Sequence, residues 1–221
     1  MVNNKGAFWQ ALVFTVVVFG IGLILGFFLD SFRVSSVQGD IFQSEINLLD
    51  EQLRSRVVED FGIGCVEAKE SVFSFADKIY DEARLLEQQD SAAKFTNNLE
   101  ILHKRYDLLR LMLWTEALKL REKCDESFHT LVYLYDYSTK EVDVQSRQLF
   151  FSRLLLDVKD NHPEEILLIP IAGDLGLESV DLVKERFGVS ELPAIIIDED
   201  EVVYEVITLE EIENIIFENS N

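Results

Sequence analysis

The chain has 221 residues, a hydrophobic fraction of 48% and a formal net charge of -21. This hydrophobic content is sufficient for a packed core, so disorder is not the expected state. A surface this negative repels phosphate backbones, which disfavours nucleic-acid binding. It suits solubility, cationic partners or loosely held divalent cations.

Residues 7–29 contain no charged side chain and predict one transmembrane helix, with Trp9 near its start. The alternative is a cleaved signal peptide, but residues 30–33 (DSFR) give no A-x-A cleavage site. Lys5 and the amino terminus precede the apolar run with no acidic residue, whereas Asp30, Arg33, Asp40 and Glu45 follow it. The positive-inside rule therefore predicts a single-pass membrane protein with a cytoplasmic N-terminus and an extracytoplasmic remainder.

Gly22 and Gly26 form a GxxxG spacing inside this apolar run. Such spacing allows two transmembrane helices to pack closely, so homo-oligomerisation through it is one hypothesis. Chance occurrence in an apolar segment is the alternative.

Residues 40–124 contain no proline and show helical periodicity. Asp40 with Gln43 predicts a capping box that begins a first helix, and glycines at 62 and 64 interrupt the pattern. Apolar residues over 72–86 then form a second stripe.

A third stripe runs from residue 95 to residue 124 in alternating steps of four and three, which is typical of a coiled-coil seam. With a turn at 88–92, the second and third helices predict an antiparallel hairpin. We interpret the stripes as core packing, with an oligomerisation seam as the alternative.

The two cysteines mark the ends of this hairpin, since Cys65 begins the second helix and Cys124 ends the third. They are predicted to form a disulfide bond, which requires an oxidising compartment; two unpaired thiols are the alternative. The chain has no CxxC and no zinc-ligand spacing, because His103, His129 and His162 are scattered. We therefore predict ordinary surface or boundary histidines, no metal site and no cofactor.

After residue 124 the pattern alternates between strands and helices. The predicted order is strand, helix, strand, helix, two strands and a helix, at residues 130–135, 142–158, 166–171, 179–187, 194–197, 202–207 and 208–217. The fold class is therefore α+β or α/β.

Residues 184–197 read KERFGVSELPAIII, in which a helix, a glycine and a short loop lead to a proline and a strand. This stretch resembles thioredoxin, and Pro193 matches the cis-proline position of that family. The element order resembles the thioredoxin fold as well, over about residues 127–217. Thioredoxins carry CxxC between the first strand and the first helix, but residues 136–143 (DYSTKEVD) hold no cysteine. The resemblance therefore implies a domain that cannot form a mixed disulfide at that position.

The resemblance also implies a groove beside the proline. Leu192 and Pro193, with Tyr137 and Ser138 opposite, are the candidate residues for binding a peptide or a partner without redox chemistry. The alternative is that Pro193 only fixes a buried loop. No catalytic residue is predicted, because Ser138 has no histidine base in its sequence context and no enzyme motif is present.

The acidic stretch 198–201 (DEDE) is interpreted as a solvated hairpin turn. Calcium binding by its oxygen atoms is the alternative, although the spacing is not that of an EF-hand.

The sequence thus predicts three regions: an anchor (1–30), a helical hairpin (31–125) and a thioredoxin-like domain (126–221). The leading hypothesis is a non-catalytic, membrane-anchored interaction or scaffold protein with a protein partner. The alternatives are a divergent thiol–disulfide oxidoreductase that uses Cys65 and Cys124, and an acidic protein that binds divalent cations.

Overall fold

The computed structural model describes residues 4–90, 96–124 and 128–218. The chain divides into two compact units, Met1–Asp50 and Glu51–Asn221. The first consists of most of helix α1 (Asn4–Asp60), and the second contains all the other elements.

The first unit contains one segment, Phe8–Phe27, that is long and apolar enough to cross a membrane. Its mean hydropathy is 2.3 and its side chains are not buried. A signal sequence would meet the same criteria of length and composition. Apart from its chain neighbours and the backbone of its own helix, no described atom lies within 4 Å of a Cβ added at Gly22 or Gly26.

Helix α1 is continuous, so the prediction that a helix begins at Asp40 is wrong. Residues 30–40 contain one glycine and no proline, and a single helical glycine costs only about 1 kcal/mol. A capping box is a local preference that a continuing helix can override. The helix ends before Gly62, whose φ of 64° lies in the left-handed region typical of helix C-termini.

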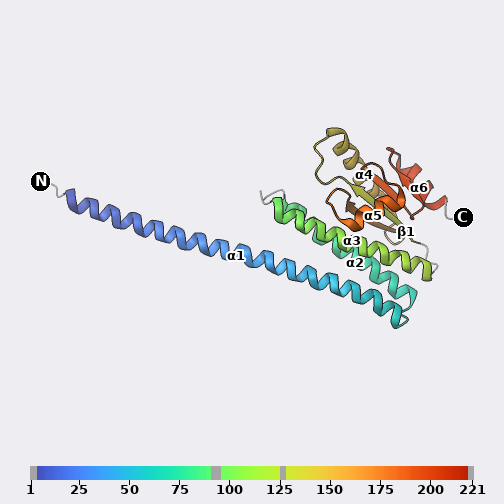
Figure 1. The fold of residues 1–221 in the computed structure, drawn as a ribbon, viewed down its shortest axis with the longest axis horizontal. Coiled ribbons are helices and arrows are strands. Elements are labelled where there is room, and N and C mark those ends of the chain that lie inside the picture. Colours follow the sequence, from blue (N-terminus) through green and yellow to red (C-terminus); the bar gives the residue numbers. More distant parts are fainter. Residues whose placement is uncertain (1–3, 91–95, 125–127, 219–221) are drawn as a thin grey trace. The chain divides into compact units, whose positions relative to one another are not determined.

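Helices α2 (Cys65–Asp90) and α3 (Thr96–Cys124) form the predicted hairpin (Figure 1). The buried residues that belong to the predicted stripes are Val72, Ile79, Ala83, Leu109, Leu113, Ala117 and Leu120. The hairpin also buries residues outside those stripes, namely Ala68, His103, Asp107, Arg110, Leu111 and Trp114. The predicted disulfide bond between Cys65 and Cys124 is confirmed, with a Cα–Cα distance of 5.6 Å. The predicted turn at 88–92 is wrong in its first three residues, because α2 continues to Asp90. Residues 91 and 92 of that turn lie outside the described residues, as does residue 95.

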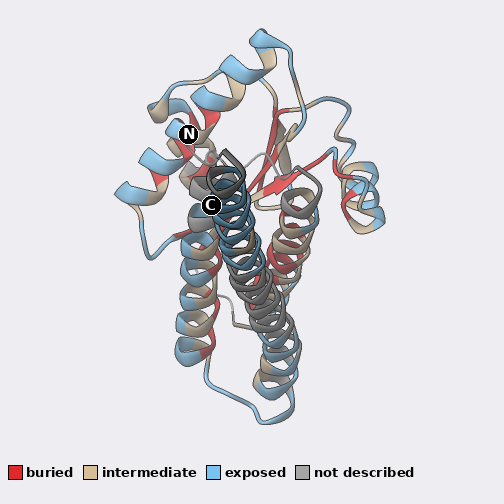
Figure 2. Cartoon of the chain, turned by 90° about the vertical axis from the view of Figure 1, so that its left-hand side faces the viewer, coloured by how far each residue is buried: buried red, intermediate tan, exposed pale blue. Residues whose placement is uncertain are grey.

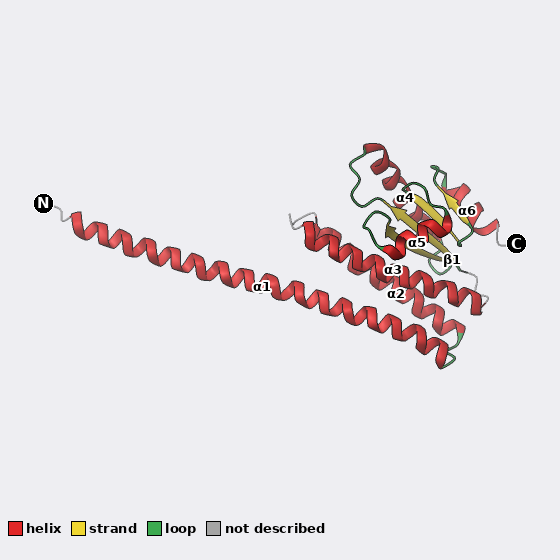
Figure 3. Ribbon diagram, in the orientation of Figure 1, coloured by secondary structure: helices red, strands yellow, loops and turns green. Residues whose placement is uncertain are grey.

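The second unit has a four-stranded mixed sheet (Figure 3). Its strands are β1 (His129–Tyr135), β2 (Ile166–Ala172), β3 (Ala194–Ile197) and β4 (Glu201–Val203), in the order β2-β1-β3-β4. Strands β1 and β2 are parallel, whereas β3 is antiparallel to both β1 and β4. In this register Val132 lies opposite Ile169 on one side and Ile196 on the other.

Helices α4 (Val142–Asn161) and α6 (Leu209–Glu218) pack against one face of the sheet. The shared core includes Leu131, Ile195, Phe151, Leu155, Ile212 and Ile216. Helix α5 (Glu178–Phe187) meets α3 through Phe187, whose ring stacks on that of Trp114 at a centroid distance of 5.5 Å. Figure 2 shows buried residues along the strands and on the helix sides that face them.

The predicted elements of this unit are confirmed, except that the last strand is shorter than 202–207. Tyr204 follows that strand. Its hydroxyl donates a hydrogen bond to the Gly188 carbonyl and accepts one from the Ser190 main-chain N–H. The capping box of α6 is confirmed, because Glu211 accepts a hydrogen bond of 2.7 Å from the Thr208 main-chain N–H.

Strand β2 forms one edge of the sheet and carries Pro170. Proline lacks an N–H and is tolerated only at edges and bulges of a sheet. Helix α3 packs beside β2, and its Asp107 lies against the main-chain N–H of Ala172. Pro170 and Asp107 therefore both limit the pairing capacity of this edge.

Candidate functional site

Three loops of the second unit meet at one end of the sheet: the loop after β1, the loop after β2 and the loop before β3. The register places Leu134 opposite Ala194, and the Gly173 N–H donates a 2.8 Å hydrogen bond to the Tyr135 carbonyl. Because β1 and β2 are parallel, their carboxyl-terminal ends lie at the same end of the sheet. Since β3 is antiparallel to β1, its beginning lies there too.

Asp174 holds the loop that follows β1. Its carboxylate accepts hydrogen bonds from the main-chain N–H groups of Tyr137 (2.7 Å) and Ser138 (3.0 Å). The Ser138 hydroxyl donates a third bond of 2.6 Å to the same carboxylate. Two of the predicted site residues are thus fixed by an aspartate that the sequence analysis did not single out.

Asp136 and Asp174 interact directly. Burial raises the pKa of Asp136, and the adjacent Asp174 raises it further. Burial would also raise the pKa of Asp174, but hydrogen bonds from Ser138 and Tyr137 outweigh burial and lower it. Asp174 therefore carries the negative charge of this pair more readily than Asp136.

The other two predicted site residues lie on the loop before β3. The Leu192–Pro193 peptide bond is cis. Pro193 is buried and Leu192 is half-buried. A Cβ added at Gly173 would lie 2.8 Å from Cδ1 of Leu192, so the leucine reaches the residue next to Asp174. Gly173 and Asp174 therefore connect the Tyr137–Ser138 loop to the Leu192–Pro193 loop.

Cys65 and Cys124 belong to a different part of the unit. Their bond joins the beginning of α2 to the end of α3, and none of the three loops contains a cysteine. These loops therefore hold no sulfur that could exchange with a disulfide.

Helix α3 lies beside the loop cluster. The His103 ring contacts the Tyr137 ring at a centroid distance of 4.5 Å. With 8% of its surface exposed, His103 is buried, so the prediction of a surface or boundary histidine is wrong at this position. One turn further along α3, burial raises the pKa of Asp107 to about 6, although Arg110 and the Ala172 N–H favour its ionised form.

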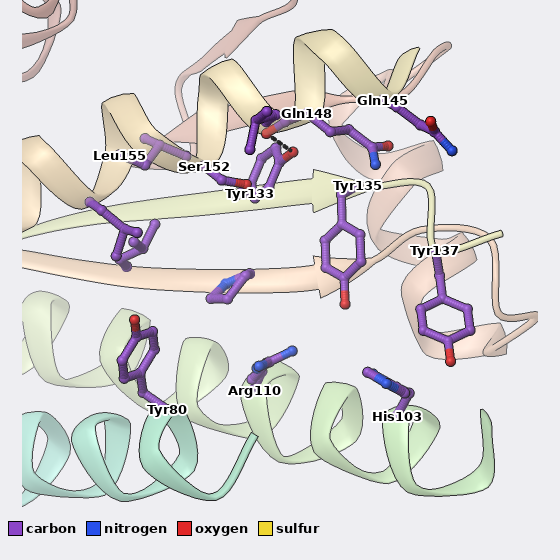
Figure 4. Close-up of a pocket in the computed structure, with 14 residues that line it drawn as sticks. Tyr80, His103, Arg110, Tyr133, Tyr135, Tyr137, Gln145, Gln148, Ser152 and Leu155 are labelled. Carbon is purple, nitrogen blue, oxygen red and sulfur yellow. Dashed lines mark hydrogen bonds between the residues drawn. The ribbon is translucent and has the colours of Figure 1, made fainter. Parts of the chain in front are cut away.

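A cavity of about 560 Å³ adjoins Tyr137 (Figure 4). It lies between α2 and α3 on one side and α4, β1 and β2 on the other. Four tyrosines line it, namely Tyr80, Tyr133, Tyr135 and Tyr137. Figure 4 shows Tyr135 and Tyr137 directed toward α3, whereas the Tyr133 hydroxyl donates a hydrogen bond to the Gln148 carbonyl of α4. The sequence analysis missed this cavity, because its lining comes from separate elements and leaves no local pattern.

The acidic turn 198–201 differs from the solvated turn that the sequence predicts. Asp198 and Glu199 are half-buried and have positive φ values of 49° and 65°. Arg121 of α3 lies 2.9 Å from each of their carboxylates. Glu199 also accepts a hydrogen bond from Trp114, and Asp198 contacts His129. Burial raises the pKa of Glu199, although its hydrogen-bond donors lower it.

Within residues 4–90, 96–124 and 128–218, no group of three or more histidine, cysteine, aspartate or glutamate side chains is placed to hold a metal ion. Two carboxylates of the acidic turn, those of Asp198 and Glu199, instead pair with Arg121 of the chain itself. Neither protein-family models nor curated proteins give a match to this chain.

Proposed function

We propose that this protein is a non-catalytic, membrane-anchored interaction protein. In this proposal its C-terminal domain is thioredoxin-like and redox-inactive, and it binds an extended segment of a partner protein. The contact residues would be Tyr137, Ser138, Leu192 and Pro193. The N-terminal apolar helix would anchor the protein in the membrane, with the rest of the chain on the extracytoplasmic side.

The observation that carries the proposal is the meeting of three loops at the carboxyl ends of β1 and β2. In thioredoxin-like proteins the corresponding junction carries the redox cysteines and the proline loop. Here Asp174 holds the first loop at Ser138, and Gly173 gives Leu192 room beside it. The parallel β1–β2 pair followed by the β3–β4 hairpin is also the order that the resemblance predicts.

The hydrogen bonds of Asp174 favour a structural role for this aspartate over activation of Ser138 as a nucleophile. Asp174 accepts the Ser138 hydroxyl hydrogen bond, but it also accepts two main-chain bonds that fix its position. An aspartate used in this way stabilises a loop. The exposed Ser138 and the half-buried Leu192 then offer one polar and one apolar contact to a segment.

The test is site-specific photocrosslinking in living cells. A photoreactive phenylalanine analogue replaces the exposed Ser138, and the same analogue at the exposed Leu182 of α5 serves as the control. We expect a crosslinked species of defined mass from position 138 and not from position 182. Mass spectrometry of the crosslinked product then identifies the segment that is bound.

Two further substitutions show whether Leu192 contributes. Leu192→Asp introduces a charge into the contact, and Gly173→Ala displaces the leucine side chain, which is flexible enough to move at small cost. Both changes should abolish the crosslink at position 138. A crosslink that survives both changes in folded protein would exclude the proposed groove.

A further inference from the structure

Helix α1 carries an apolar stripe that the chain itself does not bury. The stripe consists of Ile46, Leu49, Leu53 and Val57, which are 57%, 56%, 58% and 43% exposed. Steps of three, four and four residues place these side chains on one face of the helix. Single exposed leucines are ordinary on a protein surface, but a row of them on one helix face indicates a contact surface.

Helix α2 packs against a different face of α1. Arg54 of α1 donates a 2.9 Å hydrogen bond to the Ser71 hydroxyl of α2, and its guanidinium group lies 5.5 Å from the centroid of the Phe75 ring. Val58, one turn later, lines a groove together with residues of α2 and α3. Arg54 and Val58 each directly follow a stripe residue, so they lie about 100° further round the helix. The hairpin therefore holds α1 from one side and leaves the stripe open.

The part of α1 that precedes the hairpin needs a packing partner. Among the described residues, the first compact unit contains α1 alone. Residues 28–50 of this unit lie beyond the apolar segment Phe8–Phe27, so in the proposed topology they extend into water. Helices in water draw most of their stability from the packing of an apolar face and not from intrinsic propensity. The stripe supplies such a face where the chain offers no partner for it.

The continuity of α1 makes a second copy of the chain the partner that fits this face. The helix runs without a break from Asn4, before the apolar segment, to Asp60. Two copies anchored in one membrane therefore stand parallel, with the same residues at the same height. In a parallel pair with two-fold symmetry, each stripe residue meets its own counterpart. The aliphatic side chains then form one seam between two helices, as in a two-stranded coiled coil.

The size of this contact suits partners that share a membrane. Four half-exposed aliphatic side chains from each copy would bury a few hundred Å² in all. A stable complex of two soluble proteins needs about 1,200–2,000 Å². Anchoring in one membrane raises the effective concentration of the two copies, as a tether does, and so compensates for a small contact. The stripe is therefore sufficient for two anchored copies and insufficient for a freely diffusing protein.

We propose that the stripe on α1 is the interface of a parallel, in-register homodimer. The proposal rests on the membrane anchor of the function proposed above and does not involve its loops. It also excludes the glycine pair from the contact. Ile46 lies 20 positions after Gly26, which is about 200° round the helix, so Gly22 and Gly26 lie on the side away from the seam.

The test is oxidative cross-linking of single-cysteine additions to the full chain in native membranes. Cys65 and Cys124 are bonded to each other, so within a dimer an added cysteine can pair only with the same residue of the second copy. Leu49→Cys and Leu53→Cys should each give a disulfide-linked band at twice the chain mass. The unmodified chain should give no such band.

Two positions outside the seam serve as controls. Arg56→Cys changes an exposed residue at a similar height on α1, and Gly22→Cys changes the glycine face. Neither should form the band, because a disulfide bond requires Cα atoms within about 7 Å. A band at Arg56→Cys or Gly22→Cys as strong as that at Leu49→Cys would overturn the proposal. An adduct of any mass other than twice the chain would also overturn it, because the stripe would then contact a different protein.

A second substitution tests the seam without moving the cross-linked position. Leu53→Asp should abolish the Leu49→Cys band, because two carboxylates would then face each other across the seam. Leu182→Asp makes the same change at an exposed leucine of α5 and should leave the band intact. If the band survives Leu53→Asp, the stripe is not the interface. Circular dichroism of each variant confirms that its fold is intact.

Extraction of the membranes with alkaline carbonate separates this proposal from the function proposed above. A chain that is retained in the membrane but gives no band refutes the dimer and leaves the anchor standing. A chain that is released refutes the anchor and the dimer together. The photocrosslink at position 138 depends on neither result, because it reports on the loops alone.

Discussion

Asp107 is an unusual residue, because its carboxylate is fully buried. It lies beside Arg110, which is on the same helix, and beside the end of β2. Burial raises its pKa from 3.8 to about 6, and the charge of Asp174 adds to this effect. The folded state therefore binds a proton at Asp107 more tightly than the unfolded state does. The resulting contribution to stability is complete below about pH 4 and is lost as the pH rises through about 6.

We predict that Asp107→Asn removes this pH dependence. The difference in unfolding free energy between Asp107→Asn and the unmodified protein should shift by about 2–3 kcal/mol in favour of the variant between pH 4 and pH 7.5. Urea denaturation of the full chain in detergent, followed by circular dichroism, measures it. Asp157→Asn, at an exposed position of α4, is the control. A constant difference across this range would show that Asp107 ionises normally.

At the scale of elements, the β3–β4 turn joins α3 to the sheet. Arg121 of α3 reaches both Asp198 and Glu199 at 2.9 Å and also bonds to Thr130 of β1. Because both carboxylates are only about 15% exposed, solvent screens them weakly. One arginine thus connects a helix, a strand and a turn.

We predict that Arg121→Ala lowers the unfolding free energy by about 2 kcal/mol, because two half-buried carboxylates lose their cation. Lys119→Ala, an exposed position on the same helix, should change it by less than about 0.5 kcal/mol. Denaturation midpoints of the two variants provide the comparison. Equal denaturation midpoints would show that Arg121 does not stabilise the folded state through this turn.

The elements of the second unit were predictable wherever their signals are local. The strand patterns, the glycine at 188 that ends α5 and the Thr208–Glu211 cap all lie within a few neighbouring residues. The disulfide bond followed from the ends of two helical stripes. The continuity of α1 was missed because a good capping sequence at Asp40 does not require a helix to begin there.

Contacts between distant residues were not predictable in this way. Asp198 and Glu199 pair with Arg121, which lies 77 and 78 positions earlier in the sequence. Trp114 donates a hydrogen bond to Glu199, which lies 85 positions later. No local pattern distinguishes such an acidic turn from a solvated one. Similarly, the four candidate site residues were predicted from a family resemblance. Asp174 fixes two of them, but its hydrogen bonds depend on the pairing of β1 with β2, which no local pattern predicts.

At the scale of the whole molecule, the proposed orientation can be measured through the cysteines. We predict that a membrane-impermeant maleimide labels Cys65 and Cys124 in intact cells only after treatment with a membrane-impermeant reductant. This result follows if the disulfide bond exists and faces the outside of the cell. The number of labels is read as a shift in gel mobility.

A membrane-permeant maleimide without reductant is the control and should not label. Labelling by the impermeant reagent only after lysis and without reduction would place the soluble region in the cytoplasm. In that case the proposed partner would be a cytoplasmic protein.

The bond between Cys65 and Cys124 also decides how the chain would carry a mechanical load. Tension applied between the N-terminus and the sheet passes along the covalent chain from the end of α1 through the two sulfur atoms to β1, because the bond bypasses residues 66–123. Most of helices α2 and α3 therefore lies outside the covalent load path while the bond is intact. Reduction would return those residues to the load path and release up to about 200 Å of chain.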